Sequence, residues 1–216
     1  MTRSFSDKEK KDITQQLLSR GKELFERYGL KKTSIEELTR AVGIGQGSFY
    51  IFFNSKEELF FEILDAEERE LRERIAQMIF ESSQTKRGFK DIITRSFYLM
   101  NENAIIKNVL ADEEEYSRFF SRIPKKRLKT HLEEENEFVG SIVKQLQSSG
   151  VIKNVKPEVI TGLLFGLFLL QEHKVRIGEE TFPQIIDLLI DTLCDALVTQ
   201  GKRNLLTGNP SYLMEE

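Results

Sequence analysis

Residues 33–59 read TSIEELTRAVGIGQGSFYIFFNSKEEL. Two overlapping pairs in this stretch, Thr33 with Glu36 and Ser34 with Glu37, have the spacing of a helix capping box. In that motif the hydroxyl and the carboxylate each accept a hydrogen bond from the other residue's backbone N–H. A short helix is therefore expected to begin at this point.

Glycines interrupt the middle of the stretch. Gly43, Gly45 and Gly47 lie within five residues, which predicts a tight turn after a helix that ends near Ala41. A third short helix is expected over residues 48–53, with the side chains of Phe49 and Phe53 packed in the core. Two short helices joined by a four-residue turn have the dimensions of a helix-turn-helix module.

Helical patterns extend on both sides of this module. Upstream, apolar positions between Ile13 and Tyr28 share one helical face, and Gly29 is expected to end that helix. Downstream, Ser55 and Glu58 form another capping box that opens a long fourth helix. Further helical patterns recur at 87–101, 103–121, 124–148, 157–174 and 181–200. No segment alternates with period two for long enough to indicate a strand, so we predict an all-α fold of about nine helices.

Composition supports this class. The chain has 216 residues with 31% charged residues and a net charge of -3, and its mean hydropathy is -0.37. Its single cysteine, Cys194, excludes an internal disulfide. The most apolar run, residues 159–170, is shorter than the roughly 20 residues that a membrane-spanning helix needs. With no signal-peptide pattern at the N-terminus, a cytoplasmic protein without membrane contact is expected.

The helix-turn-helix residues suit contact with DNA. Gly45 and Gly47 would let the backbone approach the sugar-phosphate wall, while Gln46 is long enough to reach a base edge in the major groove. The hydroxyl of Tyr50 and the ammonium of Lys56 could each bond a phosphate. A three-helix packing unit without DNA is the alternative reading.

Residues 33–59 resemble the DNA-binding segment of the tetracycline-repressor (TetR) family of bacterial regulators. The matching features are FERYG at 25–29, the Thr-Ser cap, the Ala-Val-Gly turn, the Gly-Ser-Phe-Tyr run, Phe53, and Ser-Lys-Glu at 55–57. This resemblance covers about the first 65 residues, and the remainder is similar to the family only in being all-helical. It implies ligand-controlled transcription, usually repression, by a homodimer that forms through its last two helices.

The resemblance also implies a domain order. We expect a helix-turn-helix DNA-binding domain over residues 1–55, with the motif itself at about 34–53, a helical ligand-binding and dimerisation domain over 56–201, and an irregular tail over 202–216. Phosphate contacts and the base-reading face together give the predicted DNA-binding residues, which are Thr33, Ser34, Gly45, Gln46, Gly47, Ser48, Tyr50, Ile51 and Lys56. Position 51 is commonly polar or basic in the family and is isoleucine here, which reduces polar base reading; if Ile51 reads a base, we expect it to contact a thymine methyl.

Two further sets of residues are predicted in the C-terminal domain. Glycines four residues apart allow two helices to approach closely, and with the apolar face of the last helix they give a dimer interface at Gly162, Gly166, Ile185, Leu189, Leu193 and Leu197. Large apolar side chains would line a pocket for an apolar or aromatic effector, or else fill the core: Phe97, Tyr98, Met100, Tyr116, Phe119, Phe120, Phe138, Phe165 and Phe168.

Catalytic and metal-binding motifs are absent from the sequence. It has no P-loop and no nucleophile elbow, and leucine stands three residues before both His131 and His173 where a di-metal carboxylate bundle would carry glutamate. We therefore expect no enzyme, cofactor or metal site. The expected partners are an operator in double-stranded DNA, a small-molecule effector and a second copy of the chain. A helical adaptor protein without regulated DNA binding is the alternative function.

The distribution of charge favours a DNA-binding regulator over an adaptor protein. Residues 1–56 hold 11 Lys and Arg against 7 Asp and Glu, whereas residues 57–216 hold 21 against 28. A basic head on an acidic body would confine DNA contact to the head.

Overall fold

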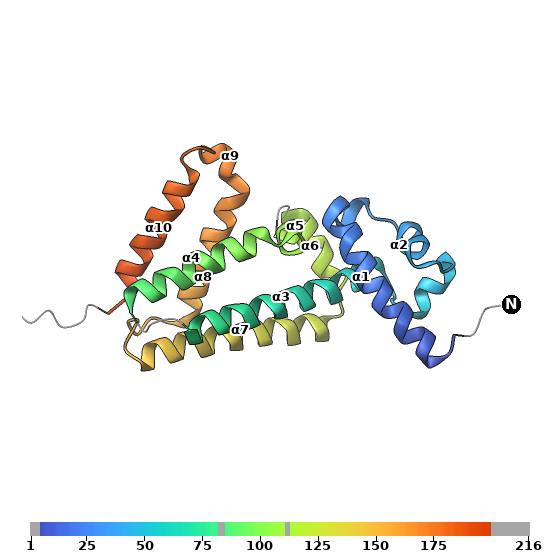
Figure 1. Cartoon of the computed structure of the whole chain (residues 1–216), viewed down its shortest axis with the longest axis horizontal. Helices are drawn as coiled ribbons and strands as arrows, with labels where there is room; N and C mark the ends of the chain where they lie inside the picture. Colours follow the sequence, from blue (N-terminus) through green and yellow to red (C-terminus); the bar gives the residue numbers. More distant parts are fainter. Residues whose placement is uncertain (1–4, 82–84, 111–112, 200–216) are drawn as a thin grey trace, which may run out of the picture.

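The computed structural model describes residues 5–81, 85–110 and 113–199. Within these ranges the chain forms ten α-helices and two short 3₁₀ helices, which confirms the all-α class. The molecule is elongated, with α1 and α2 at one end and α8 to α10 at the other (Figure 1). The tail predicted for residues 202–216 lies outside the described ranges.

The helices follow one another with short connections. In chain order they are α1 (Asp7–Lys32), α2 (Ile35–Val42), η1 (Gln46–Ile51), α3 (Lys56–Glu81), α4 (Lys86–Glu102), α5 (Ala104–Leu110), α6 (Glu113–Ser121), α7 (Lys125–Ser148), α8 (Pro157–Leu170), η2 (Gln171–His173), α9 (Lys174–Ile177) and α10 (Phe182–Leu197). None of the helices in the described part of the chain has the length and apolar character needed to cross a membrane.

Local signals account for the ends of the N-terminal helices. Ser34 caps α2 in a full capping box with Glu37, so the competing Thr33–Glu36 pair does not form. Thr33 is instead buried, and its hydroxyl donates to the carbonyl of Gly29 at 2.8 Å. Gly29 and Gly43 both have positive φ angles, near 76° and 77°, which a glycine adopts without the steric cost of a Cβ. Gly43 is the C-cap of α2, whereas Gly29, which was expected to end the first helix, forms a kink inside α1, and the helix continues to Lys32.

Three predicted helices differ from the structure. The single helix expected over residues 103–121 is two helices in the structure: α5 ends at Leu110 and α6 begins at Glu113. The acidic residues that open α6 are more favourable at a helix N-terminus than in a helix interior. The helix over 157–174 ends at Leu170 and continues as η2 and α9. The short helix expected over residues 48–53 is the 3₁₀ helix η1, over Gln46–Ile51. The 3₁₀ form is common in short helices, and Gly45 and Gly47 disfavour an α-helix here.

Two apolar clusters hold the molecule together. The first joins α1, α2, η1, α3, α5 and α6 and also includes Phe168 of α8; it contains Phe49 and Phe53 as predicted. The close packing of α1 on α3 occurs at Gly21, where an added Cβ would lie 3.2 Å from Ile63 and Leu59. The second cluster joins α4, α7, α8 and α10.

Ion pairs support the packing of α10 on α4. Lys90 pairs with Asp191 at 2.7 Å, and Lys86 pairs with Asp195. These two aspartates of α10 therefore face α4, although all four partners keep much of their contact with solvent.

Candidate DNA-binding surface and effector cavity

The segment η1 presents one face to solvent and anchors the other in the core. Tyr50 and Ile51 are 58% and 46% exposed, and Gln46 is exposed between its two neighbouring glycines. Phe49, on the opposite side, is fully buried. The buried ring fixes the orientation of η1, so its polar and small residues form a continuous outer surface.

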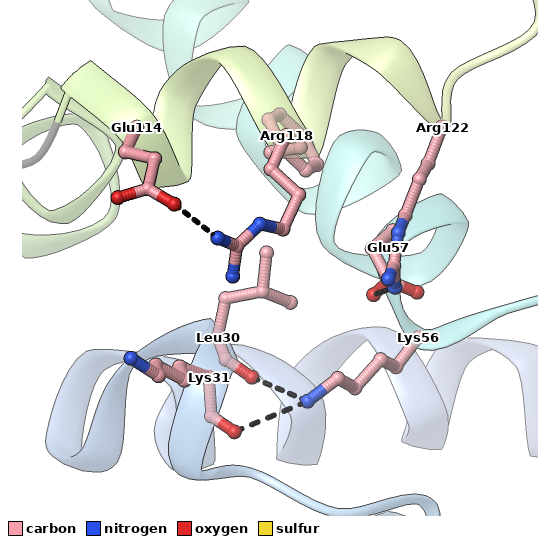
Figure 2. Close-up of a pocket in the computed structure, with 8 residues that line it drawn as sticks. Leu30, Lys31, Lys56, Glu57, Glu114, Arg118 and Arg122 are labelled. Carbon is pink, nitrogen blue, oxygen red and sulfur yellow. Dashed lines mark hydrogen bonds and ion pairs between the residues drawn. The ribbon is translucent and has the colours of Figure 1, made fainter.

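Thr33 and Lys56 both make contacts within the chain: Thr33 is buried, and Lys56 is half-buried. The Lys56 ammonium donates to the carbonyls of Leu30 at 2.7 Å and Lys31 at 3.3 Å (Figure 2). It also donates to the carbonyl of Thr33 at 2.8 Å. Ser34 remains exposed at the start of α2. The predicted residues Gly45, Gln46, Gly47, Ser48, Tyr50 and Ile51 lie together on η1 and its entry. Thr33 and Lys56 hydrogen-bond carbonyl groups at the end of α1.

Polar contacts connect this N-terminal unit to the rest of the chain. Glu57, in the first turn of α3, is buried and pairs with Arg122, which follows α6 (Figure 2). Farther along α3, Glu67 accepts from Lys22 of α1 and, at 2.9 Å, from Asn103 before α5. The position of α1 is therefore tied to α3 and to the segment between α4 and α5.

A cavity of about 360 Å³ lies between α3, α4, α7 and α8, and its wall is mostly apolar. Six of the nine predicted pocket residues line it, namely Phe97, Met100, Phe120, Phe138, Phe165 and Phe168. Phe119 instead packs in the first apolar cluster against Phe60, and Tyr98 lies in an outer groove with 44% exposure. Tyr116 belongs to α6, and its side chain is outside the described part of the chain.

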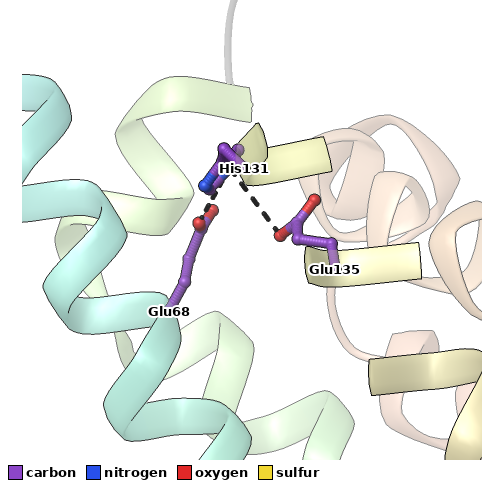
Figure 3. Close-up of side chains that lie close together, drawn as sticks. All are labelled: Glu68, His131 and Glu135. Atoms are coloured by element: carbon purple, nitrogen blue, oxygen red, sulfur yellow. Dashed lines mark ion pairs between the residues drawn. The ribbon is translucent and has the colours of Figure 1, made fainter. Parts of the chain in front are cut away.

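One side of the cavity is polar, which the sequence did not predict. Glu68 of α3 and His131, Glu135 and Asn136 of α7 lie there beside Arg72 (Figure 3 shows the first three). Burial raises the pKa of Glu68 to about 8, and the nearby carboxylates of Glu135 and Asp65 add to this effect while Arg72 opposes it. The i, i+4 spacing of His131 and Glu135 on one helix was the only sequence signal for this group.

The opposite end of the molecule exposes apolar surface. Gly162 and Gly166 of α8 have open space where a Cβ would project, and Leu163 beside them is 40% exposed. On α10, Leu188 is 68% exposed, although it was not among the predicted interface residues. Of those residues, Ile185, Leu189 and Leu193 are half-buried, whereas Leu197 is packed inside the chain's own core.

The comparison with protein families decides what the N-terminal unit is. Residues 17–63 match the family described as bacterial regulatory proteins, tetR family. The chain carries a TetR-family N-terminal domain. The match begins in the middle of α1 and ends in the second turn of α3, so it contains η1, its anchor Phe49 and the Lys56 joint.

Solved structures of TetR-family regulators share the fold over most of the chain. A TetR-family transcriptional regulator from Pectobacterium atrosepticum is 17% identical, with a TM-score of 0.69 over 92% of this chain and 100% of that one. One from Marinobacter aquaeolei VT8 is 16% identical, with a TM-score of 0.55 over 90% and 100%. The regulator FadR from Bacillus subtilis, solved in complex with stearoyl-CoA, is 14% identical, with a TM-score of 0.57 over 86% and 97%. No curated protein sequence matches the chain.

The TetR-family fold therefore extends beyond the sequence match. Helices α4 to α10 have no family signal of their own in the sequence, yet the solved structures cover them. At such low identity the likeness establishes the fold, and the roles of individual residues depend on their geometry in this chain.

Proposed function

We propose that the protein is a TetR-family transcriptional repressor that binds a palindromic operator as a homodimer and releases it when a small apolar molecule fills the cavity. The observation that carries this proposal is the course of α3. This helix begins at Lys56, beside η1, and its later turns line the cavity with Leu64, Leu71 and Ile75. One continuous helix thus connects the surface for DNA with the space for an effector.

The DNA surface explains why two copies would be needed. A single η1 offers a short outer face with Gln46, Ser48, Tyr50 and Ile51 for contact, and its cationic neighbour Arg40 is already paired with Glu36. Two such faces placed in successive major grooves, about 34 Å apart, would double the contacts and read an inverted repeat. The affinity of one head alone would be low because few cations neutralise phosphates.

The exposed apolar faces of α8 and α10 support self-association at the end away from η1. Paired with the same faces of a second copy, they would form a four-helix interface with two-fold symmetry. Gly162 and Gly166 would let the two copies of α8 approach closely, and Leu163 and Leu188 would bury their exposed surface.

The cavity supports an effector with a large apolar part. Its wall is built mainly from phenylalanine, leucine and isoleucine. The FadR structure, solved in complex with stearoyl-CoA, supports a ligand of this kind, because the stearoyl group is a long apolar chain. An effector that fits the cavity better when α3 and α7 are shifted would favour the arrangement that does not match the operator. The Glu57–Arg122 and Lys22–Glu67 pairs would transmit that shift to α1 and η1.

Selection of bound fragments from the source genome tests the proposal. The full chain should retain fragments that share an inverted repeat, and gel shifts on them should weaken steeply as the salt concentration rises. The double variant Gln46→Ala, Tyr50→Phe, which changes only exposed atoms, should lose this enrichment while keeping the same helix content. Failure of the unmodified chain to enrich any sequence would favour an adaptor protein without regulated DNA binding.

A further inference from the structure

Three potential metal ligands meet at the polar side of the cavity (Figure 3). Nε2 of His131 lies 3.2 Å from Oε2 of Glu68 and 4.0 Å from Oε1 of Glu135. All three ligand atoms lie within 4.8 Å of one another. They come from two helices, with Glu68 on α3 and the other two residues on consecutive turns of α7.

These separations are close to those around a bound metal ion. A tetrahedral zinc ion with bonds of about 2.0 Å to nitrogen and oxygen holds its ligand atoms about 3.3 Å apart. The pair formed by His131 and Glu68 already has this spacing, and a change of rotamer at Glu135, which is partly exposed, would bring in the third ligand. His131 and Glu135 are four residues apart and therefore occupy one face of α7.

The second ring nitrogen of His131 has the partner that metal-bound histidines usually have. Nδ1 lies 3.2 Å from Oδ1 of Asp65, one turn before Glu68 on α3. A carboxylate that accepts the Nδ1 proton fixes the tautomer and directs the lone pair of Nε2 toward the other two ligands. His131 is 5% exposed and its ring packs on Phe61, so its orientation is held from both sides.

The balance of charge around the imidazole also favours a cation. Three carboxylates face it, those of Asp65, Glu68 and Glu135. Arg69 pairs with Asp65 at 2.6 Å, and Arg72 comes only within 4.0 Å of Glu135. Oε2 of Glu68 is buried, and apart from the nearby Nε2 of His131 it has no hydrogen-bond partner among the described residues, so ionisation of this carboxyl group is costly unless a cation lies beside it.

We propose that Glu68, His131 and Glu135 bind a divalent transition-metal ion of the zinc type, with Asp65 as a positioning residue. One imidazole and two carboxylates suit zinc, and the imidazole disfavours magnesium or calcium, which prefer oxygen ligands alone. Three protein ligands leave a coordination position open, and all three residues border the cavity, so that position would be accessible to a donor group on a cavity ligand. The ion would also join α3 to α7.

Zinc titration of the full chain tests the site directly. The untagged protein, treated with a chelator and then dialysed, is titrated with ZnCl₂ by isothermal calorimetry and with CoCl₂ by visible absorption. We expect a single ion to bind per chain, with an absorption band typical of low coordination number for cobalt. Glu68→Gln, His131→Gln and Glu135→Gln should each weaken zinc affinity at least about 10-fold, and Asp65→Asn by about 10- to 100-fold.

Matched variants separate this site from adventitious binding. His173→Gln removes the chain's other histidine, and Glu134→Gln removes an exposed carboxylate next to Glu135; both should keep the affinity of the unmodified chain. Circular dichroism of the metal-free variants checks that each is folded, and Glu68→Gln replaces His131→Gln if the latter is not. The proposal is overturned if the unmodified chain takes up no stoichiometric zinc, or if folded ligand variants bind it as tightly as the unmodified chain.

Discussion

The ammonium of Lys56 donates to the backbone carbonyl of Leu30 at 2.7 Å. Leu30 lies in the last turn of α1, and Lys56 opens α3. Carbonyls at the end of a helix lack partners within it, so a cation at this position satisfies them and opposes the negative end of the helix dipole. One side chain thus fixes the end of the first helix against the start of the helix that leads to the cavity.

Replacement of Lys56 with alanine should therefore lower stability as well as DNA affinity. We expect a loss of about 1–3 kcal/mol in the free energy of unfolding, the usual range for hydrogen bonds to a charged group, measured by urea denaturation. Lys31→Ala, which removes an exposed cation of the same joint and leaves its carbonyl in place, should change stability by less than about 0.5 kcal/mol. An unchanged unfolding midpoint in the Lys56 variant would show that the contact contributes nothing.

Gln46 and Tyr50 should separate sequence reading from general affinity. Gln46→Ala should alter the preferred base at one position of each half-site, with a loss of about 1–3 kcal/mol in discrimination, because a base-edge contact carries sequence information. Tyr50→Phe should weaken binding to all sequences alike, because a phosphate contact carries none. Selection from a randomised DNA library measures both effects. Identical selected sequences for Gln46→Ala and the unmodified chain would remove Gln46 from the reading face.

The residues whose roles depend on the local backbone could be predicted from the sequence. The Ser34–Glu37 capping box and the positive φ angles at Gly29 and Gly43 each depend on a few consecutive residues. The burial of Phe49 and Phe53 followed from helical spacing beside exposed small residues.

Features that depend on distant segments could not be predicted. Lys56 reaches the carbonyl of Leu30, 26 residues earlier, only because α1 ends beside the start of α3. Phe119 and Phe120 are adjacent in sequence, yet the first fills the core and the second borders the cavity, because about 100° of helix rotation separates them. The cluster of Glu68 and His131 likewise requires α3 and α7 to lie side by side (Figure 1).

Substitution at Gly166 should test the proposed dimer without disturbing the single chain. A Cβ at Gly166 meets no atom within 4 Å, so Gly166→Leu should fold with the same helix content. In a close helix–helix interface the added side chain would separate the two backbones, and the dimer should dissociate into monomers by analytical ultracentrifugation. Gly140→Leu, at an equally open position on α7, is the control and should remain dimeric. A stable Gly166→Leu dimer would place the interface elsewhere.

The thiol of Cys194 should be slow to react in the folded protein. Cys194 is on the buried face of α10, and burial, with a smaller effect from Asp191, raises its pKa to about 11. An unperturbed thiol has a pKa of about 8.5, and only the thiolate is the nucleophile, so at pH 8 the reactive fraction should be lower by about 100-fold or more. The rate of modification by a chromogenic disulfide should rise with pH towards 11 and increase sharply in guanidinium chloride.

Because the chain has no other cysteine, the whole signal reports this thiol. Fast modification at pH 8 with the helix content unchanged would mean that α10 opens readily from α4, and that the second apolar cluster is looser than its burial indicates.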